Sequence, residues 1–370
     1  MNLQTLAQNI RRLRTAKRFS QKGLAEASGL SLPAVKNLEL AKNEPRMRTL
    51  QAIATALDVK LYELFLPVRP LRSVRFRSAK RMQNRENILA EVSRWLNDFN
   101  DLEVMLNRRV RFKLEGVWEE CSKDNIVEAA ALCRKKLRLK SSEPIYDICG
   151  LLEAAGVKVR LLSLASNSFF GLSVAERDGG PAIVVNAWER IPVERRIFSA
   201  AHELGHLMLH RDAFDVSQTK ENKIEEKEAD LFAGHFLMPN EGFIEEWNDT
   251  CGLNLVDRVF KIKRIFRVSY KTVLFRLKEC AITDDSIWMR LNQAYQRRYN
   301  RKLSFKEEPL AIDSSEPCGL KPVDFQEDRF SRLVREAVEK DKISLSRGAE
   351  MLGIGVEDMQ EILRNWGTVQ

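Results

Sequence analysis

Short amphipathic segments open the chain, and their apolar residues recur at helical spacing. Ser20 and Ser31 each precede such a segment, and serine is a preferred helix N-cap. Gly29 lies between the two segments and allows the chain to turn. This pattern predicts a helix-turn-helix. The positions expected to face its core are Leu24, Ala25, Val35 and Leu38.

Further apolar residues at helical spacing follow in residues 49–65, and we expect them to complete a compact domain of five helices. The helix that begins after Ser31 would enter the major groove of DNA. A repressor-like fold used only for protein contacts is the alternative. The candidate DNA-contacting residues are Gln21, Lys22, Ser31, Leu32, Lys36 and Asn37.

A second helical stripe predicts a long helix with one buried side. Its apolar members are Ile197, Phe198, Ala201, Leu204, Leu207 and Met208. Gly205 falls within this helix, where glycine costs roughly 1 kcal/mol relative to alanine. We therefore expect another group to approach the backbone closely at Gly205. A further helical segment over residues 224–237 must end before Pro239.

Two strand-like runs precede these helices, at residues 169–174 and 182–185. The turn signal Arg177-Asp178-Gly179-Gly180 separates them, so they predict a hairpin. The edge of this hairpin could bind a substrate as an added strand. A purely structural hairpin is the alternative.

The segments outside these motifs are predicted more coarsely. Residues 67–81 form a linker rich in proline and arginine, and residues 84–106 form one long amphipathic helix. Its apolar face is more typical of an intramolecular core than of a dimer seam. The residues of this face are Leu89, Val92, Trp95, Leu96 and Phe99.

The carboxyl-terminal end resembles half of a second helix-turn-helix, at residues 342–354. The helix expected to read DNA carries Glu357, Asp358 and Glu361, which would repel phosphate. We therefore interpret this end as a structural or partner-binding module. Residues 303–325 are expected to be its flexible connection.

The net charge of the chain is confined to one end. Residues 1–85 contain 18 Lys and Arg against 5 Asp and Glu, a net +13, whereas the remainder has 43 against 47, a net −4. Binding to DNA phosphates requires such a local excess of positive charge. The charge distribution thus favours DNA binding by the predicted helix-turn-helix.

The candidate catalytic residues lie in the predicted helix that contains Gly205. It contains the run His202-Glu203-Leu204-Gly205-His206. Residues four apart share one face of a helix, so both histidines can bind one Zn²⁺ while Glu203 acts as general base. Two solvated or core histidines are the alternative. The helical context favours the metal site.

A catalytic zinc needs a third protein ligand. Glu225, Glu226 and Glu228 are the candidates, and we choose Glu226 because Asp230 lies one turn further on the same face. From there Asp230 could bond the second nitrogen of a zinc-bound histidine. We expect Glu228 to be solvated and consider Glu225 the weaker rival; a surface carboxylate is the alternative for Glu226.

The other histidines and the cysteines are expected to serve structure. His210 is interpreted as a helix-end residue near the negative end of the dipole, and His235 as a satisfied core or rim histidine. The six cysteines have no CxxC spacing and are expected to be reduced thiols in a cytoplasmic protein. No apolar run approaches the length of a membrane span, so we expect no membrane partner.

Two family resemblances follow from these motifs. Residues 1–66 resemble the XRE family of Cro/repressor-type helix-turn-helix domains, although Ala41 stands where such domains usually have glycine and Pro33 lies in the reading helix. Residues 125–280 resemble the ImmA/IrrE metallopeptidases through Arg195–Ala201, the HELGH run and the stretch Glu226–Pro239. These resemblances imply a bacterial or phage regulator whose relatives act on repressor-like proteins in stress responses or mobile-element induction.

The expected fold is α+β and mostly helical. It comprises a five-helix repressor-like domain (1–66), a linker and long helix (67–124), a zincin-like peptidase domain with a small sheet (125–282), and a linker with a helical module (283–370).

The expected function is DNA-binding transcriptional regulation combined with zinc-dependent cleavage of a repressor-like or toxin-like protein. One Zn²⁺ per chain, a double-stranded DNA operator and pairing as a homodimer are part of this expectation. The alternative is a repressor or antitoxin-like DNA-binding protein whose zinc site is structural or sensory.

Overall fold

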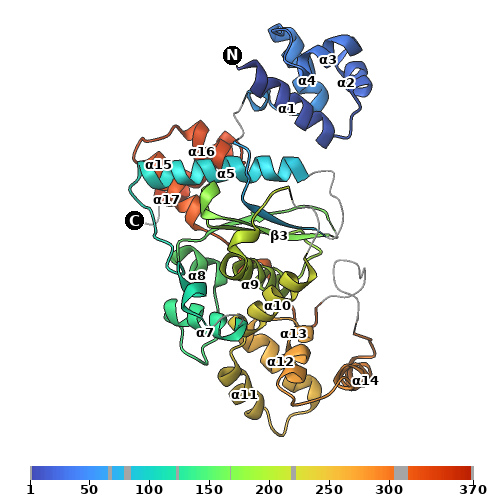
Figure 1. Cartoon of the computed structure of the whole chain (residues 1–370), viewed down its shortest axis with the longest axis vertical. Helices are drawn as coiled ribbons and strands as arrows, with labels where there is room; N and C mark the ends of the chain where they lie inside the picture. Colours follow the sequence, from blue (N-terminus) through green and yellow to red (C-terminus); the bar gives the residue numbers. More distant parts are fainter. Residues whose placement is uncertain are drawn as a thin grey trace. The chain divides into compact units, whose positions relative to one another are not determined.

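The computed structural model describes residues 2–65, 69–78, 85–121, 125–166, 168–217, 222–303 and 316–367 (Figure 1). The chain divides into two compact units. Unit 1 comprises Met1–Leu71 and Lys80–Asp98, and unit 2 comprises Arg72–Ala79 and Phe99–Gln370. No helix within the described ranges is long and apolar enough to cross a membrane.

Unit 1 begins with a bundle of short helices. They are α1 (Leu3–Ala16), α2 (Gln21–Ser28), α3 (Leu32–Glu39), α4 (Met47–Leu57) and the 3-10 helix η1 (Leu61–Leu64). The fifth helix of the expected domain is therefore a single 3-10 turn. The buried residues of this bundle form a core of its own, separate from that of unit 2.

The predicted helix-turn-helix of unit 1 is confirmed, including its two serine N-caps. The Ser20 hydroxyl accepts a hydrogen bond from the Gly23 amide at 2.9 Å, and Ser31 accepts one from the Ala34 amide at 3.3 Å. Gly29 has a φ of 65°, a left-handed conformation that ends α2. All four residues expected to face the core are buried, namely Leu24, Ala25, Val35 and Leu38.

Unit 2 contains a four-stranded mixed sheet in the order β1-β3-β4-β2. Its strands are β1 (Val74–Ser78), β2 (Lys158–Leu162), β3 (Phe169–Val174) and β4 (Ala182–Asn186). The predicted hairpin is confirmed, since β3 and β4 pair antiparallel. The 3-10 helix η2 (Glu176–Asp178) and Gly179, with a φ of 91°, make its turn. β2 joins the other side of β4 in parallel.

Strand β1 corrects the interpretation of residues 67–81 as a linker. Val74–Ser78 pairs antiparallel with β3 and forms the edge of the sheet. Val74 is 1% exposed, and the Phe76 ring stacks on that of Phe169 with centroids 5.1 Å apart. Alternate apolar side chains therefore dock this segment on the core. The expected linker residues 67–68 and 79–81 lie outside the described residues.

The expected long helix is α5 (Arg85–Met105), which begins in unit 1 and ends in unit 2. On its apolar face Val92, Trp95, Leu96 and Phe99 are buried. The helices of unit 2 that follow are α6 (Val117–Glu120), α7 (Ile126–Lys136), α8 (Ile148–Ala154), α9 (Val193–Leu209), η3 (Arg211–Ala213), α10 (Lys223–Leu237), α11 (Asn240–Asn248), α12 (Leu255–Phe266), α13 (Tyr270–Glu279) and α14 (Ile287–Tyr299). Helices α9 and α8 pack on the sheet, and α11 and α14 lie further from it (Figure 1).

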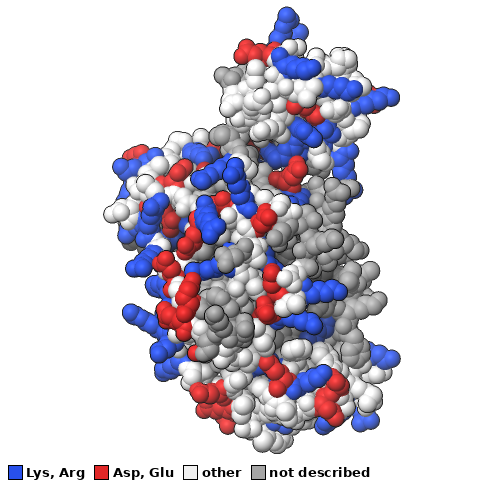
Figure 2. All heavy atoms as spheres, viewed as in Figure 1, with Lys and Arg blue, Asp and Glu red and all other residues white. Residues whose placement is uncertain are grey.

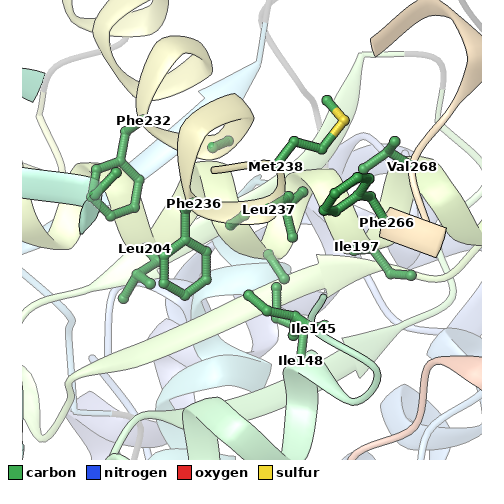
Figure 3. Close-up of a cluster of buried hydrophobic side chains, with 14 of the residues drawn as sticks. Ile145, Ile148, Ile197, Leu204, Phe232, Phe236, Leu237, Met238, Phe266 and Val268 are labelled. Carbon is green, nitrogen blue, oxygen red and sulfur yellow. The ribbon is translucent and has the colours of Figure 1, made fainter. Parts of the chain in front are cut away.

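The core of unit 2 is built around α9 and α10 (Figure 3). α9 packs on β3 and β4, and α10 packs on α9. Phe232 and Phe236 of α10 stack with centroids 5.7 Å apart and lie beside Leu204 of α9. Burial of such large apolar side chains is the main term that holds two helices together.

Gly205 has the role expected of it. A Cβ atom added at Gly205 would lie 3.1 Å from the Phe232 ring and 3.3 Å from the Ala229 Cα atom. The backbones of α9 and α10 therefore approach each other at this glycine. The prediction that another group comes close to the backbone at Gly205 is confirmed.

The carboxyl-terminal part of unit 2 contains η4 (Pro322–Asp324), α15 (Arg329–Glu339), α16 (Leu345–Leu352) and α17 (Val356–Gly367). Ser344 caps α16 and Gly353 ends it with a φ of 69°, the same cap and turn that Ser20 and Gly29 give α2. Glu357, Asp358 and Glu361 are exposed on α17. The partner-binding role of this module stays a prediction.

The connection before that module is packed where it is described, which corrects the expectation of a flexible segment over residues 303–325. Residues 304–315 lie outside the described residues. The buried Lys263 ammonium pairs with Glu194 and lies 3.5 Å from Glu316 Oε1. The Leu320 amide also donates to Glu194, and Phe325 is 2% exposed. Buried charges and one phenylalanine thus fix residues 316–325.

The six cysteines are free thiols. Cys133 and Cys149 are buried, and burial raises the pKa of both thiols. These two side chains act as small apolar residues of the core.

Ala41 provides a test of backbone strain in unit 1. Its φ is 53°, whereas an L-residue pays roughly 1–2 kcal/mol for the left-handed region. Ala41→Gly should raise the free energy of unfolding of unit 1 by about 0.5–1 kcal/mol, after the added freedom of the unfolded chain is subtracted. Gly29→Ala is the matched control and should lower it by about 1 kcal/mol, because a Cβ there meets nothing within 4 Å and only conformation is tested. Hydrogen exchange of the α2 and α3 amides at increasing denaturant concentration measures the free energy of unfolding of both variants. A lower free energy of unfolding for Ala41→Gly than for the wild type would contradict the strain.

Candidate metal centre

Two helices bring the predicted metal-binding residues together. α9 carries His202, Glu203 and His206, and α10 carries Glu226. One ligand atom from each of His202, His206 and Glu226 lies within 4.8 Å of the others. The Nε2 atoms of His202 and His206 are both 3.4 Å from carboxylate oxygens of Glu226. Both imidazoles are fully buried, and the Glu226 side chain is 13% exposed.

Asp230 lies where the sequence places it, one turn beyond Glu226. The His202 Nδ1–H donates a hydrogen bond to Asp230 Oδ1 at 2.7 Å. A neutral imidazole that donates from Nδ1 keeps its lone pair on Nε2. Asp230 therefore orients His202 so that its Nε2 lone pair faces Glu226.

His206 is oriented by a longer chain of hydrogen bonds. His210 Nε2 donates to Glu228 Oε2 at 2.8 Å, and the His206 and His210 Nδ1 atoms are 3.0 Å apart. A carboxylate accepts only, so His210 donates from Nε2 and accepts the Nδ1–H of His206. Nε2 of His206 then carries the lone pair.

This chain of hydrogen bonds changes the expectations for Glu228 and for His210. Glu228 is 38% exposed, so it is solvated in part, but it also binds His210 across the two helices. His210 does end α9, as expected, but it is only 8% exposed and contacts His206 as well. Burial lowers the pKa of His210, which favours the neutral imidazole that this arrangement requires.

The donor set fits a zinc ion. Burial lowers the pKa of His206 to about 3, so this imidazole is neutral at physiological pH. Its Nε2 atom is buried without a hydrogen-bond partner among the described residues. Burying an acceptor in this way costs free energy unless a cation or donor satisfies it. Two imidazole nitrogens and one carboxylate are the ligands of a catalytic zinc that keeps one position for water.

Glu203 follows His202 on α9, between the two histidines, and is 1% exposed. A Cβ atom added at Gly171 of β3 would lie 3.0 Å from Glu203 Oε1. Glycine at position 171 therefore leaves the space that the Glu203 carboxylate occupies. This role of Gly171 was not predicted from the sequence; a glycine inside a strand is the signal that indicates a close approach.

Arg75 of β1 is a second residue that the sequence analysis missed. Its guanidinium pairs with Glu225 and lies 3.3 Å from Glu226 Oε1. Glu225, the weaker rival for the third ligand, is thus held by an arginine, and it is not in the group of converging ligand atoms. A pairing between segments 150 residues apart leaves no signal in local sequence.

His235 is a buried histidine, as predicted, but only its Nε2 atom has hydrogen-bond partners; its Nδ1 atom is buried without one among the described residues. Its Nε2 atom is 2.7 Å from Glu279 Oε1 and 3.1 Å from a guanidinium nitrogen of Arg276, and the residue is 6% exposed. It takes no part in the group around Glu226.

In unit 1, the candidate DNA-contacting residues have different surroundings. Lys22, Ser31 and Lys36 are exposed. Gln21 donates to Glu39 at 2.7 Å, and Leu32 packs partly against the core. Asn37 is half-buried. On the visible face, basic side chains spread over unit 1 with a few acidic ones among them (Figure 2).

Comparison with protein families gives two matches along the chain. Residues 10–64 match the helix-turn-helix model, and residues 152–278 match the IrrE N-terminal-like domain, a peptidase family. The chain contains a helix-turn-helix domain followed by an IrrE-like peptidase domain. Both resemblances inferred from the sequence are thereby confirmed. The IrrE-like domain includes every residue of the converging donor set.

Other comparisons add less to this assignment. No curated protein sequence matches the chain. A crystal structure of ComR from Streptococcus suis aligns at 13% identity and a TM-score of 0.17, covering 98% of this chain and 96% of that one. PlcR from Bacillus thuringiensis, in complex with the peptide PapR7 and DNA, aligns at 12% identity and a TM-score of 0.18, covering 97% and 99%. At these scores the alignments carry no argument about the IrrE-like domain.

The hydrogen-bond chain behind His206 can be tested by zinc affinity. His210→Leu removes the acceptor of the His206 Nδ1–H, and loss of such a partner typically weakens metal binding about 10–100-fold. Competition with a chelating dye measures the affinity. His235→Leu is the matched control, since it also removes a buried, carboxylate-bound histidine of the IrrE-like domain and should leave zinc affinity unchanged. Equal affinities for both variants and the wild type would rule out the orienting role.

Proposed function

We propose that the chain is a DNA-binding transcriptional regulator whose IrrE-like domain is a zinc-dependent endopeptidase. The observation that carries this proposal is the convergence of His202, His206 and Glu226, with the buried Glu203 next to His202 on α9. Nitrogen and carboxylate donors with an adjacent general base are what zinc-dependent amide hydrolysis requires. The helix-turn-helix domain supplies the regulatory part of the proposal.

In the proposed hydrolysis, different residues of the chain bind the metal, transfer the proton and orient the ligands. A zinc ion held by His202, His206 and Glu226 would provide a water of lowered pKa and polarise the scissile carbonyl. Glu203 takes a proton from that water and delivers it to the departing amine. Overall, a C–O bond forms between the water oxygen and the carbonyl carbon, the C–N bond breaks, and one carboxylate and one amine result. Asp230 and His210 keep the two imidazoles in the tautomer that binds metal.

The substrate in this proposal is another protein, of repressor-like or toxin-like type. Cleavage of such a protein, in a stress response or in induction of a mobile element, would connect the peptidase with the DNA-binding unit. On the DNA side, the exposed Lys36 and the half-buried Asn37 of α3 are the residues proposed to reach base edges. The net +13 of residues 1–85 supports attraction to phosphates.

A second function is favoured by one observation. Arg75, in the segment between the DNA-binding helices and the peptidase, contacts the metal-binding carboxylate of Glu226. In the alternative, the zinc site is sensory: metal would compete with Arg75 for Glu226, and occupancy would be passed to the DNA-binding unit without cleavage. Removal of the general base separates the two functions.

Glu203→Gln tests catalysis. The amide occupies the same space but accepts no proton, so hydrolysis of the protein substrate should fall by at least about 100-fold. Zinc content, measured by elemental analysis, should stay at one per chain, because Glu203 is not a ligand in this proposal. Cleavage of labelled casein is the first assay. Unchanged cleavage in Glu203→Gln would refute the mechanism, and no cleavage by either zinc-loaded protein would favour the sensory alternative.

Lys36→Ala with Asn37→Ala tests the DNA-reading helix. Loss of base contacts should weaken binding to the selected operator by roughly 10–100-fold, at about 1–3 kcal/mol for each good contact. Operators are first selected from a random DNA pool with the wild type, and affinity is measured by fluorescence anisotropy at fixed salt. Lys60→Ala, a charge loss outside α2 and α3, should change affinity far less. Equal losses at both places would indicate phosphate attraction alone.

A further inference from the structure

Strand β3 lies directly beside the proposed general base. Gly171 of β3 faces the Glu203 carboxylate, and β4 pairs with β3 on one side. The other side of β3 presents backbone N–H and C=O groups to whatever lies next to it. A strand edge of this kind binds an extended polypeptide through its main chain.

That edge is covered by the chain itself. β1 pairs antiparallel with β3, with Val74 opposite Val174 and Phe76 opposite Leu172. β1 lies outside residues 152–278, which match the IrrE-like family and which include β2, β3 and β4. Within the matched domain alone, the edge of β3 would therefore be bare. The segment between the DNA-binding helices and α5 supplies the missing neighbour.

Contacts on both sides of β1 hold the covering segment in place. The Ala175 amide donates to Ser73 O at 3.0 Å, and the Val216 amide donates to Arg72 O at 2.8 Å. The Phe76 ring stacks on Phe169. The Asp178 carboxylate also accepts hydrogen bonds from the Arg72 and Ser73 amides. Main-chain hydrogen bonds, this carboxylate and one aromatic contact therefore hold the segment.

Arg75 connects this segment to the metal-binding residues. Its guanidinium lies 3.3 Å from Glu226 Oε1, the oxygen that is itself 3.4 Å from His206 Nε2. Glu225 pairs with the same guanidinium, and the Arg75 side chain is 11% exposed. Two adjacent carboxylates can serve two cations: when Glu226 binds metal, Glu225 still holds the arginine. The Glu225 and Glu226 carboxylates thus offer a place for one basic side chain next to the metal site.

We propose that the β3 edge is the docking surface for the cleaved protein and that Arg72–Ser78 occupies it as a built-in competitor. The partner it fits is an exposed, extended segment with a basic residue followed by an aromatic one. Its main chain pairs with β3, its basic residue reaches Glu225, and its aromatic ring lies on Phe169. This inference rests on the proposed peptidase function. Docking of the substrate requires that Arg72–Ser78 leave the edge.

A peptide added in trans tests the docking surface without relying on cleavage. The probe is a fluorescent peptide with the sequence of residues 69–80, and the proteins are zinc-loaded, full-length and carry Glu203→Gln so that nothing is cut. Arg75→Gln with Phe76→Ser loosens the built-in segment, so the probe should bind this variant at least about tenfold more tightly than the Glu203→Gln parent. A probe with the arginine and phenylalanine at positions 75 and 76 replaced by glutamine and serine should bind neither protein.

The matched control is Arg111→Gln, which removes an arginine whose side chain is 89% exposed and which pairs with Glu115 at the surface of the same unit. It should bind the probe as weakly as the parent does. Equal binding of the probe to all three proteins, or binding to none, overturns the inference. Hydrogen exchange of residues 72–78 gives a second measurement, and the segment should exchange faster in the Arg75→Gln, Phe76→Ser variant only.

Cleavage of labelled casein by the same proteins with Glu203 restored separates this inference from the proposed function. Faster cleavage by the Arg75→Gln, Phe76→Ser variant, reversed by the probe peptide, supports both. Selective probe binding without any cleavage supports the docking surface and refutes the peptidase. Equal cleavage by all proteins, with no selective probe binding, supports the peptidase and refutes the docking surface.

Discussion

The close approach of α9 and α10 at Gly205 is the constraint on which the candidate site depends. Gly205 lies between Glu203 and His206 on α9, and its neighbour Ala229 lies between Glu226 and Asp230 on α10. The two backbones are therefore closest where the chemically important side chains project. Side chains of the length of histidine and glutamate can meet across this contact, and the stacked Phe232 and Phe236 anchor it in the core. A larger distance between α9 and α10 would move the histidine donors of α9 away from the carboxylate donor of α10.

The part of the site that is local in sequence could be predicted, and the part that depends on helix crossing could not. His202, His206, Glu226 and Asp230 follow from four-residue steps along two helices, which any helix obeys. The contact of His210 with Glu228 depends instead on how the last turn of α9 meets the first turns of α10. On α10 alone, helical geometry points Glu228 away from Glu226. Only the packing of α9 against α10 shows that His210 lies next to Glu228.

The fold, too, has parts that local sequence predicts and parts that it does not. The caps at Ser20 and Ser31 and the turn at Gly29 are properties of a few neighbouring residues, so the sequence predicts them well. Strand β1 was missed because its partner lies about a hundred residues away, and a short run with several arginines is also typical of a solvated linker. Buried pairs such as Lys263 with Glu194 and Glu316 escape prediction too, since charged residues usually signal surface.

The two units are interleaved along the chain. The chain passes from one to the other after Leu71, after Ala79 and after Asp98. Unit 1 is closed by contacts between its own two segments: Arg12 donates to Asn87 at 3.3 Å, and Ser93 to the Arg69 carbonyl at 2.6 Å. A single genetic crossover in this region would split the residues of one unit between two parents. A fragment that ends after Leu71 would therefore keep the core of α1–η1 but lose the contacts that Asn87 and Ser93 of α5 make with Arg12 and Arg69.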